Sequence, residues 1–146
     1  MTNTDTTTTT STSTTPTSTT PMTDTSMTDT IDQHLQAYAM PDADRRNALV
    51  AANWNVDGEL LDPPLEGRGH AEISALTDVV LTHYAGHRFE RTTMVDAHHG
   101  FARYGWDLVG PDGKSAVSGI DIVQFDGAGK LLRVVGFFGP LVPLAS

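Results

Sequence analysis

Three side chains are polar where the surrounding pattern favours an apolar residue, and they are the first candidates for chemistry. Tyr38 lies on the apolar face of a helical stretch, Asp62 ends an apolar strand, and Asp121 stands between two isoleucines in mid-strand. A buried hydroxyl needs a hydrogen-bond partner. A buried carboxyl either pairs with a cation or is shifted towards its neutral form. The three residues are therefore candidates for acid–base chemistry.

Each candidate also has a purely structural interpretation. Asp62 precedes two prolines and could be a turn residue at the strand end. Asp121 could face solvent, or form an ion pair with Arg103 or Arg133. Tyr38 could be a core aromatic residue with a satisfied hydroxyl. Only the combination of the three favours a site.

The six histidines lack the spacing of a metal site. His98 and His99 fall at a predicted turn, where adjacent side chains point apart, and the others are interpreted as surface or capping residues. A single pocket histidine acting as acid or base remains an open alternative. The chain contains no phosphate loop, dinucleotide fingerprint or serine-nucleophile elbow. We therefore expect neither a metal nor an organic cofactor.

Two hydrophobic periods organise the chain around these residues. Apolar side chains at helical spacing predict helices over 30–39, 43–54 and 71–84, with a short strand over 56–62 between the second and third. The period then changes to about two. Strands are predicted at 89–98, 101–109, 116–125 and 131–138, joined by turn residues. The fold class is α+β, with three N-terminal helices packed on a curved, mostly antiparallel sheet.

The N-terminal stretch differs from the remainder of the 146 residues. Residues 1–30 contain 17 threonines and 4 serines but neither lysine nor arginine. Such a segment buries too little apolar surface to offset its ordering entropy. We expect a disordered tail over 1–29 and one domain over 30–146.

The net charge and the composition limit the classes of partner that the chain is expected to bind. The net charge is −9 and the basic residues are scattered, so we expect binding neither to nucleic acid nor to a membrane. The chain has no cysteine, no apolar run long enough to span a bilayer and no secretory signal at its start. We therefore expect a cytoplasmic protein.

The predicted sheet has apolar side chains on both faces. Tyr104, Trp106 and Leu108 share one face while Phe101 lies on the other, and strand 131–138 has large apolar residues on both. Three helices can cover only one face. We therefore expect a homodimer formed through the outer face of the sheet.

The order of these elements resembles the nuclear transport factor 2-like superfamily, and within it the SnoaL-like and bacterial ketosteroid isomerase branches. The most specific segments are Leu-Leu-Asp62-Pro followed by Gly67-Arg-Gly69, and Gly119-Ile-Asp121 followed by Phe125-Asp-Gly. The resemblance spans about residues 30–140 and implies a cone-shaped α+β barrel.

The resemblance also implies roles for the three candidates. Ionised Asp62 would remove a proton from a carbon next to a carbonyl, while Tyr38 and neutral Asp121 would donate hydrogen bonds to the enolate oxygen. Trp54 and Thr77 stand where ketosteroid isomerases have supporting aromatic hydroxyls. An apolar cone for a small apolar molecule would be lined by Trp54, Leu76, Val80, Phe89, Val123, Phe137 and Phe138.

Three functions follow as hypotheses. The first is an enzyme that acts on an apolar carbonyl compound by proton transfer, of the isomerase or polyketide cyclase type. The second is a module of the same fold that binds a hydrophobic ligand or dimerises without turnover. The third is an epoxide hydrolase with Arg103 between Asp62 and Asp121.

Overall fold

The computed structural model describes residues 23–145, so residues 1–22 of the tail predicted over 1–29 lie outside the described residues. Helix α1 (Asp24–Ala37) begins six residues earlier than predicted. The side chain of Thr23 accepts a hydrogen bond from the Ser26 amide at 3.1 Å and caps the helix. Met27 extends the buried face of Ile31 and Leu35 by one turn. Residues 24–29, placed in the tail by the sequence pattern, therefore belong to the helix.

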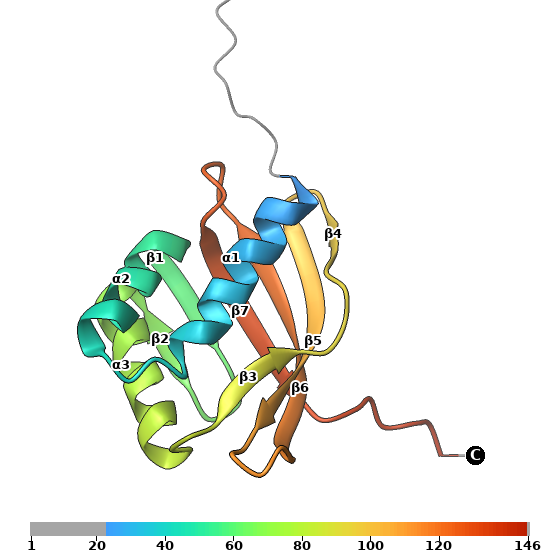
Figure 1. Cartoon of the computed structure of the whole chain (residues 1–146). Helices are drawn as coiled ribbons and strands as arrows, with labels where there is room; N and C mark the ends of the chain where they lie inside the picture. The colour runs from blue at the N-terminus through green and yellow to red at the C-terminus, as the bar shows by residue number, and fades with distance from the viewer. Residues whose placement is uncertain (1–22, 146) are drawn as a thin grey trace, which may run out of the picture.

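Two further helices lie on the same side of the sheet as α1 (Figure 1). Helix α2 (Ala43–Asn53) is capped by Asp42, whose carboxylate accepts from the Arg45 amide at 3.0 Å. Helix α3 (Gly69–His83) follows at once on the short strand β2 (Glu66–Arg68). The sequence pattern predicted the helices but not β2.

The sheet has seven strands in the order β2-β1-β7-β6-β5-β3, with β4 also paired to β5. The remaining strands are β1 (Trp54–Leu61), β3 (Arg88–Arg91), β4 (Asp96–His98), β5 (Phe101–Val109), β6 (Ser115–Phe125) and β7 (Leu131–Phe138). The β1–β7 pair is parallel and the others are antiparallel. The predicted α+β class is confirmed, as a curved sheet that stays open over the described residues (Figure 1).

The strand predicted over 89–98 is two strands, β3 and β4. Between them the Thr93 hydroxyl accepts the Gly105 amide hydrogen bond at 2.9 Å. A side chain thus replaces a backbone partner on β5, and the ladder is interrupted.

The core fills the space between the helices and the inner face of the sheet. Its fully buried side chains include Ile31, Trp54, Leu60 and Leu131. The outer face keeps exposed apolar side chains from β5, β6 and β7, namely Phe101, Ile120, Ile122 and Phe137. Over residues 23–145, every helix is too short or too polar to cross a membrane.

Candidate functional site

A cavity of about 370 Å³ lies between the helices and the inner face of the sheet. This volume is near the lower end of the roughly 300–1,000 Å³ found for ligand pockets. The three predicted catalytic residues, Tyr38, Asp62 and Asp121, all line it. The remaining lining residues are His34, Leu35, Leu60, Pro64, Leu65, Val79, Val80, His83, Tyr84, Phe89, Trp106, Leu108, Val117 and Phe138.

Tyr38 enters the cavity from the C-terminal end of α1. Its ring packs edge-on against Phe89, with centroids 5.1 Å apart. Burial raises the pKa of its hydroxyl well above the usual range, and the charges of Asp62 and Asp121 raise it further. The hydroxyl therefore stays protonated and available as a donor.

Asp62 enters from the end of β1. Pro63 and Pro64 stop the strand, and the Asp62 amide donates to the Leu65 carbonyl at 2.8 Å across the resulting turn. The Oδ1 atom is buried and has no hydrogen-bond partner in the described part of the chain. Burial raises the pKa of this carboxyl to about 6. Asp62 is thus a turn residue and also a carboxyl that exchanges its proton near neutral pH.

Asp121 lies in the middle of β6, and two donors from β5 hold it. Tyr104 donates its hydroxyl to Oδ2 at 2.7 Å, and the Trp106 indole donates to Oδ1 at 2.8 Å. Burial raises the pKa of Asp121 to about 7, and the charge of Asp62 adds to the shift, while both hydrogen bonds oppose it. The indole can only donate. A proton on Asp121 is therefore held at Oδ2, the oxygen shared with Tyr104.

The two carboxyls meet above Gly136 of β7. Asp121 is its register partner on β6, and Asp62 follows Leu61, which pairs with Val135 on the other side. A Cβ on Gly136 would be 2.0 Å from Oδ1 of Asp62 and 3.1 Å from Oδ1 of Asp121. The missing side chain therefore makes the space in which the carboxyls approach. Two acids this close resist simultaneous ionisation.

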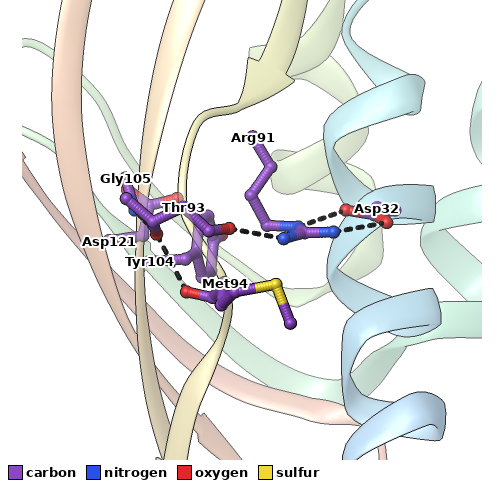
Figure 2. A network of polar contacts seen from close by, with 7 residues as sticks. All are labelled: Asp32, Arg91, Thr93, Met94, Tyr104, Gly105 and Asp121. Atoms are coloured by element: carbon purple, nitrogen blue, oxygen red, sulfur yellow. Dashed lines mark hydrogen bonds and ion pairs between the residues drawn. The ribbon is translucent and has the colours of Figure 1, made fainter.

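An ion pair fixes α1, and so Tyr38, against the sheet. Arg91 of β3 donates from Nε to Oδ1 of Asp32 at 2.9 Å and from a terminal nitrogen to Oδ2 at 3.3 Å (Figure 2). The guanidinium also donates a hydrogen bond to the Thr93 carbonyl (Figure 2). The Thr93 hydroxyl accepts a hydrogen bond from the amide of Gly105, the residue after Tyr104. This network connects the helix wall of the cavity to the strand that holds Asp121.

Three of the seven residues predicted to line an apolar cone lie at this cavity. Val80, Phe89 and Phe138 line the cavity. Trp54 and Val123 do not, because they lie in the solid part of the core at 1% and 0% exposure. Leu76 packs against Gly67 instead. Phe137 is 56% exposed, because strand alternation turns it to the outer face opposite Phe138.

The sequence pattern missed three residues of the site: His34, Tyr104 and Trp106. Strand alternation could have identified two of them, because Tyr104 and Trp106 lie two residues apart and therefore share one face of the strand. Tyr104 supplies an aromatic hydroxyl from β5, which it donates to Asp121 and not to Tyr38. His34 was interpreted as a surface or capping residue but is 4% exposed. His83 does reach the cavity, although its side chain is exposed and its Nδ1 contacts the Val79 carbonyl at 2.9 Å.

The ion-pair alternatives for Asp121 are wrong. Arg103 pairs with Asp96 at 2.8 Å on the surface, and Arg133 lies 3.4 Å from Glu59. Because neither arginine lines the cavity, the epoxide hydrolase arrangement is absent from the described residues. Within 23–145, no three histidine or acidic side chains are grouped closely enough to hold a metal ion. The arrangement suits proton transfer between carboxyls and an apolar ligand.

A solved structure has the same architecture and a related sequence. It is a candidate isomerase of the SnoaL-like family from Agrobacterium tumefaciens, 30% identical, which covers 80% of this chain and 99% of its own, with a TM-score of 0.75. The chain belongs to the SnoaL-like family.

More distant structures share the fold of this SnoaL-like protein. A candidate polyketide cyclase from Sinorhizobium meliloti is 14% identical, covers 80% of this chain and 100% of its own, and has a TM-score of 0.61. A candidate SnoaL-like polyketide cyclase from Jannaschia is 11% identical, with coverages of 78% and 85% and a TM-score of 0.64. At these identities the likeness concerns the fold alone. No family model matches the chain, and no curated protein matches it either.

Proposed function

We propose that this SnoaL-like protein catalyses proton transfer at a carbon next to the carbonyl of a small, neutral, apolar compound, as an isomerase or a cyclase. The main support is the pair of carboxyls above Gly136, one of which has a buried oxygen without a partner. A buried lone pair with no donor is costly for a structural residue. It suits a carboxyl that takes up a proton during a reaction.

The reaction would start with Asp62 in its ionised form. Its carboxylate takes the proton from the α-carbon, the electron pair of the broken C–H bond forms a C=C bond, and the π pair of the carbonyl moves onto the carbonyl oxygen. Tyr38 and protonated Asp121 donate hydrogen bonds to the resulting enolate. Asp62 then returns the proton to another carbon in an isomerase. In a cyclase, the enolate carbon forms a C–C bond to a second carbonyl carbon, the π electrons of that carbonyl move onto its oxygen, and this oxygen takes the proton from Asp62.

The charge of the cavity selects its ligand. Among residues 23–145, its lining contains two acids and no lysine or arginine. An anionic substrate such as a carboxylate or phosphate would be repelled and left unpaired. Five aromatic rings, those of Tyr38, Tyr84, Phe89, Trp106 and Phe138, favour a flat and neutral molecule.

Deuterium exchange tests the chemistry without knowledge of the natural substrate. Small cyclic ketones such as 2-tetralone are incubated with the full chain in deuterated water, and NMR records exchange at the α-carbon. We expect exchange above the buffer rate, fastest between pH 6 and 7, where Asp62 is ionised and Asp121 still protonated. Asp62→Asn should lower it to the buffer rate.

The matched control is Asp57→Asn, because Asp57 lies on the same strand and is exposed. It should retain the wild-type exchange rate. Exchange that survives Asp62→Asn would exclude Asp62 as the base.

Ligand binding without turnover is the second candidate. It is favoured by the hydrogen bonds of Tyr104 and Trp106, which occupy both oxygens of Asp121 and would suit a structural carboxyl. Under this alternative, ketones bind but no variant changes their exchange rate. Binding with an exchange rate equal to that of buffer would favour it.

A further inference from the structure

His34 is a polar side chain in the cavity wall that the proposed reaction does not use. It lies on α1 one turn before Tyr38, about 6 Å away along the helix axis. Its ring packs edge-on against Tyr38 and Trp54, with centroids 5.3 Å and 5.4 Å away. Trp54 begins β1 whereas Asp62 follows its end. His34 therefore lies between the rings of Tyr38 and Trp54, one helical turn before the end of α1 that carries Tyr38.

His34 lines the cavity, and no hydrogen bond to the described chain occupies its ring nitrogens. The side chain is 4% exposed. In that same part, Arg46 Nε and Asp62 Oδ1 are the buried side-chain atoms that lack a partner. The nitrogens of His34 are therefore not sealed in the core. The cavity that the residue lines is the space open to them.

His34 is neutral under ordinary conditions. Burial lowers its pKa to about 4, and no nearby charge contributes to that shift. By contrast, the charges of Asp62 and Asp121 both act on Tyr38. A neutral imidazole offers one N–H donor and one nitrogen acceptor. It can therefore bind a hydroxyl, which both accepts and donates, or a ketone.

We propose that His34 is a specificity-determining residue, which binds a second oxygen of the ligand away from Asp62 and Asp121. This inference rests on the proposed function and extends it to a substrate class. The substrate is a flat, neutral molecule with its reacting carbonyl beside Tyr38 and a hydroxyl or ketone at the opposite end of its ring system. The apolar rings between the two ends contact Phe89 and Trp106.

Calorimetric titration of the full chain with three naphthols tests this assignment. 2-Naphthol mimics an enolate, 2,6-dihydroxynaphthalene adds a distal hydroxyl, and 6-methyl-2-naphthol replaces that hydroxyl with a methyl group of similar size. We expect the diol to bind about tenfold more tightly than the methyl compound, the effect of one good hydrogen bond.

Two variants assign the preference to His34. His34→Phe keeps an aromatic ring against Trp54 but removes both nitrogens, and it should reduce the diol preference to about onefold. His34→Gln keeps a donor and an acceptor and should retain part of it. Both variants should bind 2-naphthol within about twofold of wild type, with unfolding temperature as the check on folding.

The outcomes separate this inference from the proposed function. A wild-type diol preference near onefold, or a preference unchanged in His34→Phe, would overturn it. So would equal weakening of all three ligands in His34→Phe, or no binding of any naphthol to wild type. Two results could also occur together: the diol preference is lost in His34→Phe, and 2-naphthol binds Tyr38→Phe as tightly as wild type. That outcome would support the role of His34 and reject the oxyanion role of Tyr38.

Discussion

Replacing Gly136 with alanine tests whether the site depends on the close approach of its two carboxyls. The new Cβ would stand 2.0 Å from Oδ1 and 3.0 Å from Cγ of Asp62, and 3.1 Å from Oδ1 of Asp121. Ordinary contacts of a Cβ begin at 3.4 Å. The Asp62 carboxyl must therefore withdraw by more than about 1 Å.

The substitution should cost far more activity than stability. A displacement of about 1 Å from the productive geometry lowers a rate by about 100-fold. The clash involves the end of a side chain rather than backbone, so its cost in folding free energy is at the low end of overpacking, about 1 kcal/mol. The lower chain entropy of unfolded alanine offsets about half of that.

The assay is α-deuterium exchange of 2-tetralone, with urea unfolding of the same samples. The control is Gly127→Ala in the turn after β6, because a Cβ there has nothing within 4 Å. We expect Gly136→Ala to lose about 100-fold in exchange rate while its free energy of unfolding changes by about 1 kcal/mol or less. The control should match wild type in exchange.

An exchange rate within threefold of wild type in a folded Gly136→Ala protein would refute this reasoning. It would mean that the reacting group does not depend on the space above Gly136.

Two further predictions concern pH and assembly. The folded-state pKa of Asp121, about 7, exceeds the unfolded value of about 3.9. The contribution of this carboxyl to the free energy of unfolding is therefore complete below pH 4, and it is lost as pH rises through 7. Asp121→Asn should therefore be more stable than wild type at pH 8 by on the order of 2 kcal/mol, and the two proteins should differ little at pH 4. Urea unfolding that finds the variant less stable than wild type at pH 8 would contradict this prediction. We also propose that the exposed outer face mediates homodimerisation. Sedimentation should then find a dimer, and Ile122→Lys should convert it to a monomer. The control Val56→Lys changes an exposed apolar side chain on β1 and should leave the dimer intact. A monomeric wild type would reject the interface.

Local patterns were sufficient for the fold class and for the candidate residues. The change of period after α3 predicted helices followed by a hairpin sheet, and the polar residues at apolar positions were those that line the cavity. The same patterns failed where a side chain replaced a backbone partner, as Thr93 does for Gly105 between β3 and β4. They also failed at the start of α1, because a threonine-rich segment masked the cap at Thr23 and the apolar contact of Met27.

The sequence by itself determined that Tyr38, Asp62 and Asp121 are buried or half-buried polar groups, because local periodicity decides which face a side chain occupies. Only the tertiary structure decided what they meet. The parallel pairing of β1 with β7 brings Asp62 to Gly136 and hence to Asp121, and the register of β5 with β6 places Tyr104 opposite Asp121. The tertiary structure likewise decided which apolar side chains line the cavity and which, such as Trp54 and Val123, lie in the solid core. Such contacts join segments far apart in the chain, and no local spacing specifies them.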